Sequence, residues 1–363
     1  MGRVTKTVWD IEPHTAKKHE ILRRYFQAWL PILGRYNSRL LYVDAFAGPG
    51  EYSKGEDGSP LVILKAARDH VLRPSCELVC LFVESHEDRY THLVGVLDRT
   101  KPTLPSNIKF RPILGKFNGQ LAEIFAQLDE QEERRGPTLA FVDPFGFSQT
   151  PFTTIARLLR YPKSEVLVNF MYGEINRFLS NPEFAAHFDE LFGTPEWRNI
   201  LNITAPISRF YAIHDLYRDQ LKTVARYVHA FLMLNKNNAP DYFLFFGTNS
   251  LKGTEAMLET MWKAAPSGEF QFSDFTESKK QIPLFEEAPD YDLLRQILIQ
   301  KFGRVQIEFE VLCDWVIEYV GFLRSHVRHV VAEMEKDVLV SVTNPKPNRR
   351  SGTYPEGTQL KFR

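Results

Sequence analysis

Residues 40–50, LLYVDAFAGPG, are the stretch that most constrains the fold of this chain. Residues 40–43 form a short apolar run with β propensity, Asp44 ends it, and Gly48 and Gly50 follow. Glycines at such positions allow the backbone to bend sharply or to approach a ligand closely. The spacing differs from the G-x-G-x-x-G of dinucleotide folds, and no Gly-Lys-Ser/Thr follows to make a phosphate loop. We therefore expect a buried strand that opens into a ligand-holding loop, with an ordinary Gly/Pro turn as the alternative.

Short apolar runs and amphipathic helices alternate on both sides of this loop, which favours a mostly parallel α/β sheet covered by helices on both faces. The helix at 58–70 is expected to begin with Ser59 as its N-cap and Pro60 as its first residue. Further strands are predicted at 78–85, 108–114, 137–147 and 164–173, and helices at 14–33, 86–98 and 118–135.

Beyond residue 173 the pattern changes. Residues 174–222 are rich in aromatic residues and predict a helical insertion, of the kind that forms a lid or a substrate platform. Two apolar runs, 227–235 and 241–249, predict an antiparallel hairpin that closes the sheet, and 254–265 predicts a helix. We therefore expect one domain over 1–265, followed by a linker over 266–289.

Residues 290–363 predict a separate domain of three helices and a hairpin with a basic tip, which is typical of a winged helix-turn-helix. The third helix would present Arg324 and Arg328 to a nucleic-acid groove, and the wing would present Arg349 and Arg350 to phosphates. Winged helices also bind other proteins, and that alternative stays open.

Composition limits the remaining possibilities. Lys plus Arg equals Asp plus Glu at 45 each, so a nucleic-acid contact must come from a local basic surface. Cys76, Cys80 and Cys313 lack the spacing of a zinc site or a disulfide framework, and we interpret them as reduced core thiols. The chain shows neither an apolar run of membrane-spanning length nor a signal-peptide core, so we expect a cytoplasmic protein.

Three signals fall at the carboxyl ends of predicted strands, where open α/β sheets bind ligands. They are the glycine loop, Glu84 at the end of the second strand, and Asp143-Pro144-Phe145 after the fourth. An acidic residue in the position of Glu84 is suited to ribose hydroxyls. The helix at 14–33 carries His14, Lys17, Lys18 and His19, which we interpret as a solvated face rather than as ligand-binding groups.

With these residues the chain resembles the class I S-adenosylmethionine-dependent methyltransferases, with DAFAGPG in place of their glycine-rich motif and DPFGF in place of the D/N-P-P-Y/F motif of amino-methyltransferases. It resembles still more closely the three-Cys-motif partner (TcmP) family, through HTAKKH, YVDAFAGPG, GSPL, FVDPFGF and a C-terminal winged helix. That resemblance implies a methyltransferase-like protein in a phage-associated or mobile gene setting, working beside a three-Cys-motif partner protein. The cysteines of the present chain are not that motif.

The resemblance assigns cofactor binding and catalysis to separate residues. S-adenosylmethionine would be held by Asp44, Phe46, Gly48, Gly50 and Glu84, and the catalytic residues would be Asp143, Pro144 and Phe145.

The DPFG motif departs from the family pattern, since Phe145 replaces the second proline and Gly146 the aromatic residue. Base stacking would then fall to Phe145 or Phe147, or the amino-methyl chemistry would be absent. Cysteine attack on a pyrimidine is disfavoured, because no Pro-Cys follows the fourth strand. Two functions therefore stand: a methyltransferase acting on nucleic acid, and a non-catalytic adaptor that positions the partner protein.

One short stretch lies inside the predicted linker. Residues 281–285, QIPLF, resemble the pentapeptide with which bacterial proteins dock onto the replication sliding clamp. The alternative is that Leu284 and Phe285 cover the protein's own surface.

Overall fold

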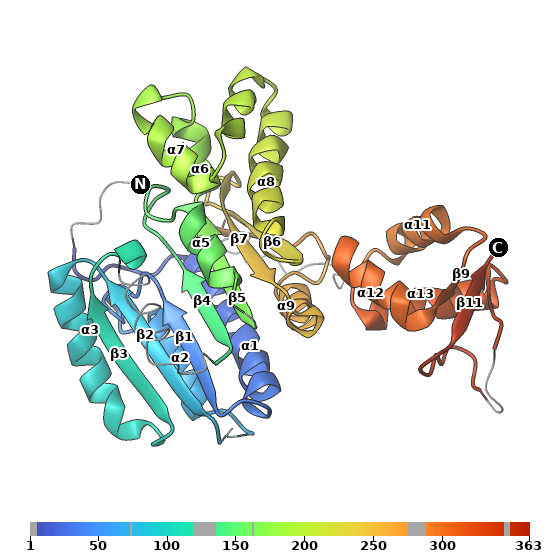
Figure 1. Ribbon diagram of the computed structural model, residues 1–363, viewed down its shortest axis with the longest axis horizontal. Coiled ribbons are helices and arrows are strands. Elements are labelled where there is room, and N and C mark those ends of the chain that lie inside the picture. The colour runs from blue at the N-terminus through green and yellow to red at the C-terminus, as the bar shows by residue number, and fades with distance from the viewer. Residues whose placement is uncertain (1–5, 73–74, 120–135, 162, 275–287, 345–348) are drawn as a thin grey trace. The chain divides into compact units, whose positions relative to one another are not determined.

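The computed structural model describes residues 6–72, 75–119, 136–161, 163–274, 288–344 and 349–363 (Figure 1). Its contacts divide the chain into two compact units. The first unit comprises residues 1–250 and 271–281, and the second comprises residues 251–270 and 282–363. Most of the predicted helix at 118–135 and the QIPLF stretch at 281–285 lie outside the described residues.

The first unit is built on an eight-stranded sheet in the order β3-β2-β1-β4-β5-β7-β6-β8. The five strands from β3 to β5 pair in parallel, β7 runs antiparallel to both of its neighbours, and β8 pairs in parallel with the outer side of β6. This mostly parallel Rossmann-like sheet with an antiparallel hairpin confirms the fold predicted for the first domain. The strands are β1 (Arg39–Asp44), β2 (Glu77–Glu84), β3 (Ile108–Leu114), β4 (Thr138–Val142), β5 (Ser164–Phe170), β6 (Tyr227–Leu234), β7 (Pro240–Thr248) and β8 (Gln271–Ser273).

The central strands are the apolar runs of the sequence, and every residue of β4 and β5 is buried. Such strands need cover on both faces, which the helices before and between the strands supply. One of them, α1, is fastened to the sheet by Tyr25, whose hydroxyl donates to the Glu165 carboxylate of β5 at 2.5 Å. Helix α1 (Pro13–Gly34) precedes β1, and the helices between the strands include α2 (Ser59–Arg68), α3 (Glu87–Thr100) and α5 (Phe152–Leu159).

The helical insertion after β5 is present as predicted. Figure 1 shows α6 (Tyr172–Phe178), α7 (Ala185–Phe192) and α8 (Pro206–Lys222) gathered at one end of the sheet. Its aromatic residues join the core of the first unit, for example through the stacked rings of Phe147 and Phe188, whose centroids are 4.8 Å apart. The insertion is therefore an integral part of this unit.

The second unit has its own core. This unit begins earlier in the chain than the sequence indicated. Helix α9 (Leu251–Ala264), which we assigned to the first domain, contributes Leu258 and Trp262 to a cluster with Leu294 and Phe309. Its other elements are α11 (Tyr291–Phe302), β9 (Gln306–Glu308), α12 (Phe309–Tyr319), α13 (Arg324–Lys336), β10 (Val340–Val342) and β11 (Gln359–Phe362).

Two short strands were missed in the sequence. The hairpin β10–β11 was expected, but β9 pairs with the other side of β11 and makes a three-stranded sheet. In the predicted linker, Gln271–Ser273 forms β8 on the first unit's sheet. Strands of three residues carry too little alternation to be recognised in a sequence.

The three cysteines are free and buried, as expected of core thiols. Among the described residues, no helix combines the length and the apolar character that a membrane crossing needs.

Candidate ligand site at the carboxyl edge of the sheet

A cavity of about 330 Å³ lies beside the carboxyl ends of β1, β4 and β5. Strand β1 pairs with β2 on one side and β4 on the other, so the chain order reverses at this point. Open α/β sheets bind their ligands in the crevice at such a switch point. The cavity is lined by residues of the segment before α1, of α1 itself, of the glycine loop, of the turn after β4, and of β5 and β7. Among them are Trp9, His14, Lys18, His19, Phe46, Gly48, Gly50, Tyr52, Asp143, Pro144, Phe145, Asn169 and Tyr242.

The loop after β1 needs its glycines. Gly48 and Gly50 have φ angles of 62° and 86°, in the left-handed region that other residues rarely adopt. A Cβ on Gly50 would come within 2.9 Å of Leu93, and one on Gly58 would come within 2.8 Å of the Gly50 backbone. The loop is therefore a tight backbone cradle. Gly48, Gly50 and Phe46, which the sequence predicted as ligand-binding residues, all line the cavity.

Asp44 lies beneath this cradle, fully buried at the end of β1. One carboxylate oxygen, Oδ1, accepts a hydrogen bond from the Phe46 backbone N–H at 3.3 Å, while Oδ2 has no partner in the described part of the chain. Burial raises the pKa of Asp44 to about 7, although hydrogen bonds from Ser59 and Phe46 oppose the shift. A buried carboxyl with an unused oxygen is suited to a cationic group of a ligand.

Ser59 contributes to the site in an unexpected way. It was predicted as the N-cap of α2, but Gly58 holds that position and Ser59 is the first helical residue. Its side chain instead acts on the Asp44 carboxyl, whose pKa it lowers.

Asp143 follows β4 and lies at the centre of a polar group inside the cavity. The Lys18 ammonium lies 2.5 Å from Asp143 Oδ2, and the Asn169 amide donates to Asp143 Oδ1 at 2.6 Å. Lys18 also lies over the ring of Tyr242, 5.1 Å from its centroid. Asp143 is thus held from two sides, and it orients Asn169 so that the amide oxygen of that residue is left without a partner among the described residues.

Aromatic residues cover one side of this group. Phe145 is 43% exposed, and its ring contacts Trp9 edge to face at 5.5 Å. The Arg89 guanidinium lies about equally close to both rings, 5.1 Å from Trp9 and 4.9 Å from Phe145. Trp9 is fixed in turn by its backbone oxygen, which accepts from the Ser53 N–H at 2.9 Å. This arrangement leaves the Phe145 ring available for stacking at the rim of the cavity.

The basic residues near the start of α1 correct our interpretation of a solvated face. His14, Lys18 and His19 are all buried and line the cavity. The sequence spacing could have predicted this burial. His14 and Lys18 precede the buried Leu22 by eight and four residues, and residues four apart lie on the same helix face.

The two histidines of α1 differ in charge. Burial lowers the pKa of His19 to about 4, with the Lys18 charge acting in the same direction, so this ring is neutral at physiological pH. Burial also acts to lower the pKa of His14, but bonds to Glu12 and Asp274 outweigh it and raise that pKa. The Asp274 contact, at 2.6 Å, ties the residue after β8 to the rim of the cavity.

Glu84 stands apart from the other predicted site residues. It is buried at the end of β2, and its Oε1 accepts from the His86 N–H at 2.8 Å. It does not line the 330 Å³ cavity, whose walls come from α1, the loop after β1, the turn after β4, and the strands β5 and β7. Its place at the carboxyl end of β2, beside the glycine loop, is nevertheless the one predicted, since the Ala47 N–H bonds to the Val83 carbonyl at 2.8 Å.

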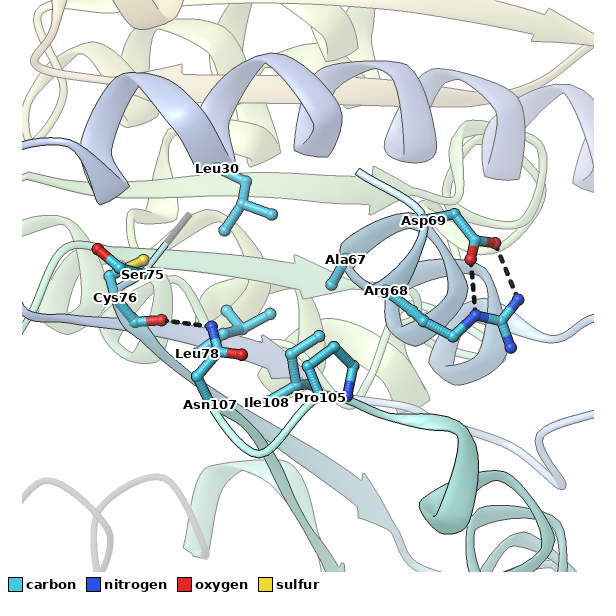
Figure 2. A pocket seen from close by; sticks show the side chains of 10 residues that line it. All are labelled: Leu30, Ala67, Arg68, Asp69, Ser75, Cys76, Leu78, Pro105, Asn107 and Ile108. Atoms are coloured by element: carbon cyan, nitrogen blue, oxygen red, sulfur yellow. Dashed lines mark hydrogen bonds and ion pairs between the residues drawn. The ribbon is translucent and has the colours of Figure 1, made fainter. Parts of the chain in front are cut away.

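A larger cavity, about 610 Å³, lies at the opposite edge of the sheet (Figure 2). It involves the amino ends of β2 and β3, away from the carboxyl edge. Figure 2 shows that its charged residues, Arg68 and Asp69, pair with each other, with Nε to Oδ1 at 2.7 Å. The carboxyl edge, with its unpaired buried oxygens, is the better candidate for chemistry.

In the second unit, the four arginines predicted to bind nucleic acid fall into two pairs. Arg324 bonds to Glu255, Glu310 and Asp314, and Arg349 bonds to Glu335 and to the Thr353 carbonyl. Both were predicted to contact nucleic acid, Arg324 in a groove and Arg349 at a phosphate, and in the structure both are paired with carboxylates of the second unit. Arg328 and Arg350 are exposed, and no ion pair with another described residue holds them.

Comparisons with known proteins leave the family of this chain open. No protein-family model matches the chain, and no curated protein matches its sequence. Among solved structures, an O-methyltransferase from Bacillus cereus in complex with SAH is 15% identical, with 66% of this chain and 82% of that chain covered and a TM-score of 0.36. Human methyltransferase-like protein 13 in complex with SAH is 13% identical over 80% of this chain and 100% of that chain, with a TM-score of 0.34.

A third similar structure is a putative class I S-adenosylmethionine-dependent methyltransferase from Listeria monocytogenes. It is 9% identical over 66% of this chain and 63% of that chain, with a TM-score of 0.35. Scores of this size carry no argument, so the description of the fold rests on the strand order of the chain itself, which is that of a mostly parallel Rossmann-like sheet.

Proposed function

We propose that this protein is an S-adenosylmethionine-dependent methyltransferase that acts on an amino group of a nucleobase. The observation that carries the proposal is the cavity at the switch point of the sheet, where the glycine cradle and Asp143-Pro144-Phe145 line the same space. A methyl donor and its acceptor must meet within bonding reach. A shared cavity between a cofactor loop and an acceptor motif meets that requirement.

The residues at the glycine loop fit the cofactor. The cradle at Gly48 and Gly50 has no room for a side chain at Gly50. A backbone without side chains allows a ligand to approach closely. The unpartnered oxygen of Asp44 is suited to the ammonium of the methionine part, directly or through water. Glu84, at the end of the next strand, is suited to the two ribose hydroxyls.

When bound, S-adenosylmethionine supplies an electrophilic methyl group on a sulfonium centre. The residues after β4 then have separate tasks. The Asp143 carboxylate and the Pro144 carbonyl accept hydrogen bonds from the acceptor amino group and orient its lone pair, and the Phe145 ring stacks on the base. Asp143 also lies where it can take the proton that the nitrogen loses as it gains the methyl group.

The second unit would supply target binding. Its described elements follow the order helix, strand, helix, helix, strand, strand after α9, and we interpret them as a winged helix with α13 as the recognition helix. The exposed Arg328 and Arg350 would contact phosphates. In line with the resemblance to the three-Cys-motif partner family, we further propose that the protein works beside such a partner.

Titration calorimetry of the full chain with S-adenosylmethionine tests the cofactor half of the proposal. Glu84→Ala should lose most of the affinity, because two charge-assisted hydrogen bonds of ~1.5–3 kcal/mol each disappear. The control is Glu77→Ala at the opposite end of the same strand, where Glu77 pairs with Arg39 and Lys109. This control should bind as the wild type does.

Asp143→Ala tests the acceptor half. It should keep cofactor binding and lose methyl transfer, since the contact orients the acceptor in the transition state. If the wild-type chain fails to bind the cofactor, the methyltransferase function is wrong, and the non-catalytic adaptor takes its place.

A further inference from the structure

Three side chains from different elements form a continuous polar strip in the wall of the cavity. Lys18 comes from α1, Asp143 from the turn after β4, and Asn169 from β5. Lys18 and Asn169 each approach a different oxygen of Asp143, at 2.5 and 2.6 Å. In the order Asn169, Asp143, Lys18, the strip therefore presents an acceptor, a second acceptor and a donor.

The strip has hydrogen-bonding capacity that the protein does not use. An ammonium has three N–H donors, and the described residues offer Lys18 one carboxylate oxygen and the face of the Tyr242 ring. The Asn169 side-chain oxygen has no partner among them, although Asn169 is only 4% exposed. Buried polar groups left in this state are costly unless a ligand completes them.

Resting on the methyltransferase function proposed above, we infer that Lys18 and Asn169 determine which base is accepted. One hydrogen of an exocyclic amino group is shared by the Asp143 carboxylate and the Pro144 carbonyl, and the other is accepted by Asn169, so the nitrogen lone pair stays free for the methyl group. Lys18, next to Asp143, donates to the ring nitrogen adjacent to that amino group. Adenine and cytosine both have an amino group beside an unprotonated ring nitrogen, whereas thymine has no amino group.

The orientation of the strip is fixed before any base enters. The side chain of Lys18 is 5% exposed, and its ammonium is held between a carboxylate and an aromatic ring. Asn169 is oriented by its bond to Asp143, since a flipped amide would set its oxygen against a carboxylate oxygen. Preorganised donors and acceptors discriminate strongly against a ligand that leaves one of them unpaired.

Base analogues that lack a single ring nitrogen test this inference. The full chain would be given radiolabelled S-adenosylmethionine and single-stranded oligonucleotides that carry adenine or 1-deazaadenine, and cytosine or 3-deazacytosine. We expect kcat/KM on the preferred natural base to exceed that on its deaza analogue by about 10- to 100-fold, the value of a hydrogen bond to a charged donor. Lys18→Met should be slower on the natural base and should no longer distinguish it from the analogue.

The neighbouring Lys17 gives a matched control. Its ammonium bonds to Glu20 at 2.9 Å and lies over the ring of Phe272, and it does not line the cavity. Lys17→Met should retain the wild-type preference for the natural base. Asn169→Leu should lower kcat on the natural base and on its deaza analogue alike. This substitution removes an acceptor for the amino group and leaves the contact with the ring nitrogen intact.

Two results separate the failure of this inference from the failure of the proposed function. Equal rates on natural base and deaza analogue in the wild type would refute the role of Lys18 while leaving the methyltransferase in place. Transfer to thymine-only oligonucleotides, or to none of the oligonucleotides despite cofactor binding in calorimetry, would also refute it. Absence of cofactor binding would instead refute the proposed function.

Discussion

The polar groups of the cavity and those of the second unit differ in how completely they are paired. Asn169 in the wall of the cavity and Asp44 beneath the glycine loop each keep an oxygen without a partner in the described chain. In the second unit, Arg324 binds three carboxylates from α9 and α12, and Glu335 accepts from Arg349 and Tyr354. Buried polar groups without partners indicate a region that binds a ligand. Polar groups whose hydrogen bonds are all made within the protein indicate a region where they stabilise the fold.

The pKa values of two carboxyls reflect the same difference. Burial dominates at Asp44 and raises its pKa to about 7. Burial also acts to raise the pKa of Glu335, but hydrogen bonds from Arg349 and Tyr354, together with the Arg349 charge, outweigh it and lower that pKa. A carboxyl that is fully paired stays ionised and structural, whereas one that lacks a cation is poised to gain it from a ligand.

The largest effect expected from this comparison is on stability. Arg324→Ala should destabilise the second unit by about 2–3 kcal/mol, because it leaves the three carboxylates of Glu255, Glu310 and Asp314 facing one another without a cation. Urea unfolding of the full chain measures this. Arg295, which pairs with Asp337 at 2.6 Å, is the control, and Arg295→Ala should cost less than about 1 kcal/mol. Equal losses in the two variants would contradict the cohesive role of Arg324.

The next effect is a pH dependence of cofactor binding. If ionised Asp44 binds the ammonium of S-adenosylmethionine, its contribution to affinity should fall about tenfold from pH 8 to pH 6, as a carboxyl with a pKa of about 7 becomes protonated. In Asp44→Asn the dependence should disappear, since the amide does not titrate there. Calorimetry at several pH values measures both proteins. If the affinity of the wild type and that of Asp44→Asn depend on pH to the same extent, the titrating group is not Asp44.

The free protein should respond to pH in the opposite direction. A carboxyl with a raised pKa in the folded state stabilises the fold fully below its unfolded pKa of about 4. That contribution is lost as the pH rises through about 7. The melting temperature of the ligand-free wild type should therefore decline over this range by more than that of Asp44→Asn.

Much of the carboxyl edge of the sheet could be predicted from the sequence because its parts are local. The glycine loop, Glu84 and Asp143 each follow an apolar run, and parallel strands bring their carboxyl ends to one edge. Lys18 was misinterpreted although its spacing from Leu22 placed it on the buried face, because a cluster of basic residues is typical of a solvated helix. Its partner, Asp143, is distant in the sequence, and sequence spacing gives no sign of such a contact.

The pairing of the basic residues in the second unit could not be predicted for the same reason. Arg324 meets Glu255 of α9 through tertiary packing, and α9 itself appeared to belong to the first domain. Counting arginines on a predicted helix therefore overestimated the charge available to nucleic acid. The number of free cations depends on the carboxylates that the fold brings to each of them.

The smallest effect expected concerns those arginines that remain available. Arg328 and Arg350 are exposed, whereas Arg349 is bound to Glu335. If the second unit binds nucleic acid through phosphates, the double variant Arg328→Ala and Arg350→Ala should weaken binding across sequences and reduce the salt dependence by about two units of slope.

Arg349→Ala is the matched comparison for that double variant. Because Arg349 is already neutralised, its removal should leave the slope nearly unchanged and should instead lower the melting temperature, by releasing the Glu335 carboxylate and the Thr353 carbonyl. Fluorescence anisotropy with a labelled duplex at several salt concentrations measures the slope. An unchanged slope in the double variant would contradict nucleic-acid binding by the second unit and would favour the alternative, that this unit binds another protein.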